Sequence, residues 1–263
     1  MLRKFSPAKV DRSYCWENLS YQWFIVQRRM KVEVKEFSPA GEWPEVSTIF
    51  YDKEVYAGLS KLKRWQAFAK TNALRPQSVL EHSVGLVFLT DWLVDKMNGN
   101  LEGQINKELL RKAVILHDVP EGILQEDVSR LDKTSKQDAK EFSAFTDFIA
   151  SKYDQANLEI LEKVYLLQFC LGDISAFTKS KQELMRQLAS DYYLEALMFR
   201  MVENLDYLLY AEEQWVRFGE ASRDLIHEVA TLVVPIIEAL VSKVPSLDTF
   251  WTPKAHKHFS KFI

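Results

Sequence analysis

From about residue 54 onwards, apolar residues recur at three- and four-residue intervals, the spacing of one face of an α-helix. Glycine and asparagine interrupt this pattern at Asn98-Gly99-Asn100, Gly172 and Gly219, as residues that end helices commonly do. The pattern therefore predicts an all-α bundle of six to eight helices. The expected helical segments are 54–70, 78–98, 106–117, 135–152, 156–171, 180–216 and 220–243.

The first 53 residues follow a different pattern. Apolar and charged residues alternate over 30–35, which predicts a β-strand, and Pro39, Gly41 and Pro44 end any regular element after it. We therefore predict a small N-terminal accessory extension that contains a β-hairpin. The expected organisation is an accessory segment at 1–53, a main helical domain at 54–218, and a C-terminal helix and tail at 219–263 that pack on this domain.

Composition narrows the function classes without selecting one. The 263 residues are 47% hydrophobic, which is ample for a core, and they include only eight glycines and eight prolines, which favours long helices over turn-rich sheets. The net charge of −3 gives no reason to expect a nucleic-acid polymer or an anionic membrane as a partner. Two cysteines do not suggest a disulfide framework. We expect a cytoplasmic protein without a membrane-spanning segment.

Two histidines and an aspartate are the strongest candidates for chemistry. His82, His117 and Asp118 each lie in an otherwise apolar segment, where an unpartnered polar side chain is costly. Two imidazoles and a carboxylate suit a mixed nitrogen and oxygen metal site. Consecutive helical residues point about 100° apart, so His117 and Asp118 can share an ion only near a helix end, and Pro120 is consistent with such an end. The alternative is a buried histidine paired structurally with its neighbouring aspartate.

Three ordered segments carry a resemblance to a known family. They are 59–65, which ends in an Arg-Trp pair, 75–83, which contains His82, and 116–121, in which Glu121 follows the His-Asp pair by three residues. Together they resemble the HD-domain metal-dependent phosphohydrolases, and within these the 5′-deoxynucleotidase-like branch. The similarity implies an HD-type helical bundle with one divalent metal ion held by His82, His117 and Asp118.

The resemblance also implies a fourth ligand, an acidic residue on a late helix. The spacing to the leucines and the glutamate that follow selects Glu203, whereas the family's aspartate at this position selects Asp206 by side-chain type. The two residues lie three positions apart on one helical face, so either can point at the ion. We prefer Glu203. Compared with an aspartate, its longer side chain moves the carboxylate by one carbon–carbon bond, which can change the metal that the site prefers.

Further roles follow from the same resemblance. Glu121 is the candidate general acid or base. Arg64 is the candidate phosphate-binding and catalytic cation, because a guanidinium group matches phosphate oxygens, and Trp65 joins it in binding the substrate. The family places another aspartate five residues after the catalytic glutamate. This sequence has Glu126 there and Asp127 next, and we prefer Asp127 because a loop easily absorbs a one-residue insertion.

The implied activity is metal-assisted hydrolysis of a nucleoside 5′-monophosphate, with deoxynucleotides included, to nucleoside and phosphate. Co, Mn, Fe, Ni and Zn suit two imidazoles and two carboxylates better than a hard ion such as Mg, and the sequence does not choose among them. A homodimer is expected from the resemblance alone.

Two alternative functions stay open. One is an HD phosphohydrolase that acts on nucleoside triphosphates or cyclic nucleotides, for which Lys61, Lys63 and the stretch 133–136 offer extra cations. The other is a catalytically inactive HD scaffold that binds a partner through its tryptophan-rich N-terminal extension.

Overall fold

A computed structural model describes residues 44–65, 75–101, 105–126 and 133–263. Over these residues the fold is all-α, as the apolar spacing predicts, and contains no β-strand. The helices are α2 (Pro44–Phe50), α3 (Lys53–Lys61), α4 (Val79–Leu101), α5 (Lys107–Leu116), α6 (Val119–Leu124), α7 (Ser135–Ala150), α8 (Gln155–Leu166), α9 (Lys179–Asp191), α10 (Tyr193–Phe218), α11 (Arg223–Lys243) and α12 (Pro253–Phe259), with 3₁₀ turns at Leu167–Phe169, Gly219–Ser222 and Pro245–Thr249.

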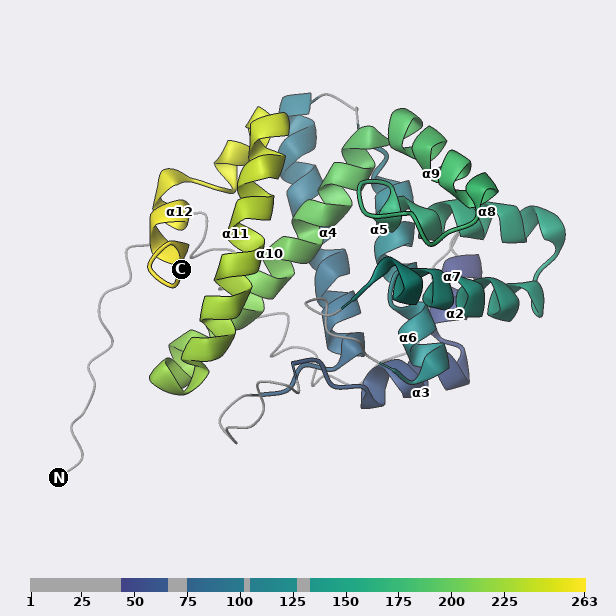
Figure 1. Ribbon diagram of the computed structural model, residues 1–263, viewed down its shortest axis with the longest axis horizontal. Helices are drawn as coiled ribbons and strands as arrows, with labels where there is room; N and C mark the ends of the chain where they lie inside the picture. The colour runs from purple at the N-terminus through teal and green to yellow at the C-terminus, as the bar shows by residue number, and fades with distance from the viewer. Residues whose placement is uncertain (1–43, 66–74, 102–104, 127–132) are drawn as a thin grey trace.

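The long helix α10 forms the centre of the bundle (Figure 1). Helix α11 packs along it, and α4 and α5 contact it from other directions. Most of its side chains are buried, including the polar side chains of Asn204 and Asp206. Buried polar groups are costly unless they are paired. The buried polar residues of α10 therefore need polar partners inside the bundle.

A local hydrogen-bonded cap begins α4 and so sets the position of His82. The backbone N–H of Ser78 donates to Glu81 Oε2 at 2.8 Å, and the backbone N–H of Glu81 donates to Ser78 Oγ at 3.1 Å. This reciprocal pair is a capping box, which fixes where a helix starts. An antiparallel bridge also joins Ser78 to Lys63. The segment that carries Arg64 is therefore held beside the first turn of α4.

The chain turns sharply between α5 and α6, at His117 and Asp118. His117 keeps a helical backbone with φ −59° and ψ −37°, whereas Asp118 leaves the helix with φ −99° and ψ 0°. Pro120 lies in the first turn of α6, where its missing N–H costs no helical hydrogen bond. This is the helix end that the sequence predicts, and it frees the two consecutive side chains from the 100° divergence of a continuous helix.

The structure differs from the predicted segments in several places. The predicted helix 180–216 is two helices, α9 and α10, separated at Tyr192, where φ is −129° and ψ is 43°. The apolar spacing continues across this break, so the pattern did not reveal it. The first predicted helix ends at Lys61. The predicted strand at 30–35 and its hairpin lie outside the described residues, and the domain boundaries at 53 and 218 stay predictions.

Within the described ranges, one apolar stretch is long enough to cross a membrane by length and composition alone. It lies within Tyr193–Lys243, where an 18-residue window has a mean hydropathy of 1.8 and is 44% buried inside the bundle. A core helix passes the same test, and this stretch comprises two helices, α10 and α11, that pack against each other. We therefore interpret it as part of the core.

Two glycines allow α3 and α6 to pack closely. A Cβ atom added at Gly58 would overlap the backbone carbonyl of Gly122, and one added at Gly122 would lie 2.8 Å from the carbonyl oxygen of Val55. Neither neighbour is a flexible side-chain end, so only glycine fits at both positions. This contact sets the position of α6, the helix that carries Glu121.

We predict that Gly58→Ala destabilises the protein by about 1–3 kcal/mol, the usual cost of overpacking, even though alanine favours a helix more than glycine does. Urea denaturation measures the effect. Gly172→Ala is the control, since its Cβ would lie 3.5 Å from the nearest atom, the carbonyl oxygen of Phe169. Equal stability of the two variants would show that the α3–α6 contact is not tight.

Candidate metal centre

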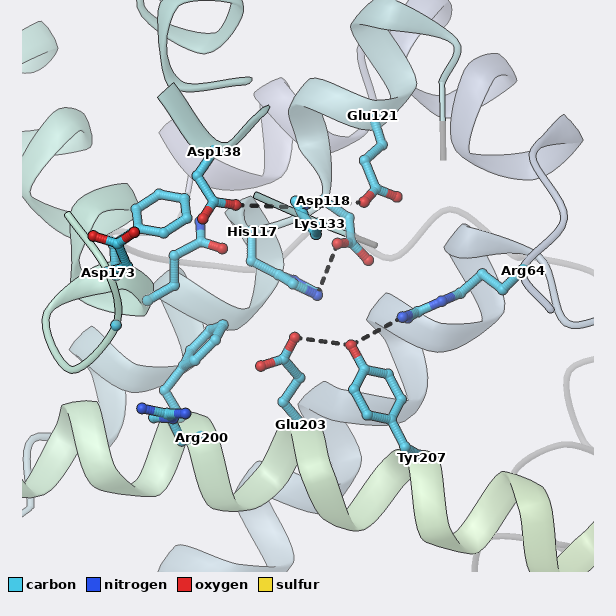
Figure 2. A pocket seen from close by; sticks show the side chains of 14 residues that line it. Arg64, His117, Asp118, Glu121, Lys133, Asp138, Asp173, Arg200, Glu203 and Tyr207 are labelled. Carbon is cyan, nitrogen blue, oxygen red and sulfur yellow. Dashed lines mark hydrogen bonds and ion pairs between the residues drawn. The ribbon is translucent and has the colours of Figure 1, made fainter. Parts of the chain in front are cut away.

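A polar pocket opens above α10, between the α5–α6 turn, the segment of Arg64 and the start of α7 (Figure 2). Charged side chains dominate its wall, and His82 lies beneath it, fully buried. The pocket is lined by Arg64, His117, Asp118, Glu121, Lys133, Asp138, Gln168, Phe169, Gly172, Asp173, Phe199, Arg200, Glu203 and Tyr207.

His82 is oriented by a buried carboxylate on α10. Its Nδ1 lies 2.7 Å from Asp206 Oδ2, and neither residue has any exposed surface. An ionised carboxylate only accepts hydrogen bonds, so Nδ1 carries the proton and the lone pair is on Nε2. A carboxylate behind the ring is the arrangement that commonly orients a metal-binding histidine.

His117 is oriented in the same sense by its own helix. Its Nδ1 lies 2.6 Å from the backbone carbonyl oxygen of Val114, one turn earlier in α5. A carbonyl oxygen also only accepts, so Nδ1 is again the protonated nitrogen and the lone pair is again on Nε2. Two independent contacts thus select the same tautomer for both histidines.

The two Nε2 atoms face each other across 3.3 Å. Asp118 lies beside them, with Oδ1 3.0 Å from Nε2 of His117 and Oδ2 3.7 Å from Nε2 of His82. One ligand atom from each of the three residues lies within 4.8 Å of the others. Lone pairs repel at such distances unless a proton or a cation lies between them. The donor set of two imidazole nitrogens and a carboxylate fits a divalent transition-metal ion.

Burial and neighbouring charges shift the pKa values of His82, His117 and Asp118. Burial would lower the pKa of His117, but contact with Asp118 raises it overall. Burial would likewise raise the pKa of Asp118, and the neighbouring His117 instead lowers it. The pKa of His82 is lowered, mainly by burial and then by the charge of Arg64. Asp118 therefore favours a positive charge beside His117, which is the charge that a metal ion would supply.

The two candidates for the fourth ligand have different positions. Glu203 lines the pocket, where its Oε1 accepts a hydrogen bond of 2.9 Å from the hydroxyl of Tyr207. Asp206 instead accepts a hydrogen bond from Nδ1 of His82, on the side of the ring away from the facing Nε2 atoms. This arrangement favours Glu203 over Asp206 as the fourth ligand, and the choice between them stays a prediction.

Glu121 and Lys133 form the wall opposite α10 (Figure 2). Lys133 Nζ lies 3.6 Å from Glu121 Oε1 and 2.7 Å from Glu141 Oε2. Burial would lower the pKa of Lys133, but the carboxylates of Glu141 and Glu121 raise it well above its usual value. Lys133 is therefore charged at any working pH and fixes the direction of the Glu121 carboxylate.

Arg64 reaches the pocket, but Trp65 does not. Arg64 Nη2 donates to the hydroxyl of Tyr207 at 3.0 Å, and its guanidinium lies over the tyrosine ring. Trp65 is absent from the pocket lining and stacks on Tyr210, with ring centroids 5.4 Å apart. Its φ of +66° is unusual for a residue other than glycine. The ring packs edge-on against Tyr207. The part of Trp65 in substrate binding stays a prediction.

Two neighbouring residues after α6 are the candidates for the sugar-binding acid. Glu126 does not line the pocket, and its carboxylate pairs with Lys140 at 2.6 Å on the surface, so its part in substrate binding stays a prediction. Asp127, the preferred candidate, lies outside the described residues. Its role stays a prediction.

Sequence reasoning missed the pocket residues Tyr207 and Arg200, and it treated Lys133 only as an extra cation. Tyr207 is four residues after Glu203 and Arg200 three before it, so helical spacing from the candidate ligand was the available signal. No local signal pairs Lys133 with Glu121 and Glu141, because that contact depends on how α6 and α7 pack.

A family model, the HD domain, matches residues 79–193. The match supports membership of the HD-domain superfamily. It contains His82, His117, Asp118 and Glu121, but it begins after Arg64 and ends before Glu203. It refers to the HD domain as a whole and not to a branch of it. Searches of curated proteins and of solved structures gave no match.

The buried ion pairs of Lys133 lead to a prediction about stability. Lys133→Met leaves the buried carboxylate of Glu141 without this cation, which costs about 3–5 kcal/mol near neutral pH. A buried, unpaired carboxylate has a raised pKa, so this penalty grows as the pH rises above the pKa of an unfolded glutamate and shrinks towards pH 5. Urea denaturation at pH 7.5 and 5.5 measures both effects.

Lys140→Met is the matched control, because Lys140 pairs with Glu126 in a half-exposed ion pair. Such a pair contributes about 1 kcal/mol or less. If the two lysine variants lost equal stability at pH 7.5, the Lys133 cluster would not be an interior ion-pair network.

Proposed function

Because residues 79–193 match the HD domain, we propose that this protein is a metal-dependent phosphohydrolase that hydrolyses nucleoside 5′-monophosphates. The observation that carries the proposal is the pair of Nε2 atoms facing each other at 3.3 Å beside Asp118. His82, His117 and Asp118 would hold one divalent ion, with Glu203 as the fourth ligand. Such an ion supplies Lewis-acid polarisation of the phosphoryl group and activation of water.

The other pocket residues have separate tasks. Arg64 binds the phosphate oxygens, since a guanidinium group stays charged and offers two parallel N–H donors. Glu121, which faces the same pocket, exchanges the proton with water or the leaving oxygen. Lys133 holds Glu121 in place through their 3.6 Å ion pair. Asp206 and the carbonyl of Val114 keep the two histidines in the required tautomer.

The arrangement of cations favours a monophosphate over a triphosphate. Lys61 and Lys63, two of the extra cations that a triphosphate site would use, do not line the pocket. Lys133 does line it, but two buried glutamates compensate its charge. Arg200 donates to the backbone carbonyl of Leu171 at 2.6 Å. Arg64 is therefore the pocket cation best placed for a phosphate, which suits a substrate with a single phosphoryl group.

We predict that the protein with added Mn²⁺ or Co²⁺ releases phosphate from nucleoside 5′-monophosphates faster than from triphosphates or cyclic nucleotides. His117→Ala should lower metal binding and turnover by more than about a hundredfold, since losing even an outer-sphere partner of a metal site costs 10–100-fold. Phosphate release and metal titration measure these effects.

His256→Ala is the control, because His256 is exposed and pairs with Glu238 far from the pocket lining. It should behave as the wild type. Absence of metal binding and of turnover across the whole panel would refute the proposed function. Turnover of triphosphates alone would leave the metal site standing and overturn the substrate assignment.

A further inference from the structure

Tyr207 joins two parts of the pocket that have different proposed tasks. Its hydroxyl accepts a hydrogen bond from Arg64 Nη2 at 3.0 Å and donates one to Glu203 Oε1 at 2.9 Å. Figure 2 shows the Tyr207 hydroxyl between Glu203 and Arg64, joined to each by a dashed line. A guanidinium group only donates and a carboxylate only accepts, so the direction of both hydrogen bonds is fixed.

The tyrosine ring is buried and contacts three neighbouring side chains. It is 3% exposed and stacks on the ring of His82, with centroids 5.8 Å apart and planes at 12°. Trp65 contacts it edge-on at 5.5 Å, and the Arg64 guanidinium carbon lies 5.0 Å from its centroid. This packing therefore keeps the hydroxyl between its two partners, and Glu203 and Arg64 are linked through one shared oxygen atom.

We propose that Tyr207 is a positioning residue that couples the phosphate site at Arg64 to the metal site at Glu203. The inference rests on the proposed function and adds a link within it. When Glu203 is ordered by a bound cation, the hydroxyl of Tyr207 is ordered too, and with it the acceptor that orients Arg64. The cation thus improves phosphate binding beyond simple charge attraction, and by thermodynamic linkage phosphate improves cation binding by the same factor.

The test uses Mn²⁺ and inorganic phosphate as probes, so it needs no turnover. Phosphate affinity is measured by calorimetry with and without saturating Mn²⁺, and Mn²⁺ affinity by electron paramagnetic resonance with and without phosphate. In the wild type each probe should tighten the other. Tyr207→Phe keeps the ring and its packing but removes the shared hydroxyl, and it should reduce this coupling factor by about tenfold, within the range for outer-sphere partners of metal sites.

Tyr210→Phe is the matched control on the same helix. Tyr210 is equally buried, but its hydroxyl donates to the backbone carbonyl of Arg75 at 2.6 Å. It should keep the wild-type coupling factor. A coupling factor in Tyr207→Phe within twofold of the wild type would overturn the inference while leaving the proposed function intact. A wild type that bound no Mn²⁺ would overturn both.

Discussion

The fully buried hydrogen bond between His82 and Asp206 is the constraint on which the site depends. It joins residues 124 positions apart and fixes the proton on Nδ1 of the histidine. The Val114 carbonyl does the same for His117. Two lone pairs are thereby made to face each other at 3.3 Å, next to a carboxylate. Such an arrangement needs a positive charge at its centre, which a proton on His117 or a divalent ion supplies.

Helix α10 organises the site through its periodicity. Glu203 lies on the face that lines the pocket, Asp206 is placed behind His82, and Tyr207 stands between Glu203 and Arg64. These three residues are neighbours on one helical face, so a small rotation of α10 would disturb all of them together. The extensive burial of α10 against α4, α5 and α11 prevents that rotation. Packing in the hydrophobic core thus fixes the positions of these three polar side chains.

Much of the fold was predictable because it has local causes. Apolar spacing indicated the helices, and Pro120 marked the helix end at the His-Asp pair. The break at Tyr192 was not predictable, because the apolar residues keep their spacing across it. The spacing favoured Glu203 over Asp206, but the two share one helical face, and no local pattern showed the contact of Asp206 with the distant His82. The surface ion pair of Glu126 with Lys140 likewise had no local signal, because it depends on how α6 and α7 pack.

Anomalous diffraction from crystals grown with Mn²⁺ tests the central claim most directly. The account predicts one peak bounded by Nε2 of His82, Nε2 of His117 and the carboxylates of Asp118 and Glu203, with Asp206 still on Nδ1 of His82. A peak coordinated by Asp206, or no peak among the two histidines and Asp118, would contradict it.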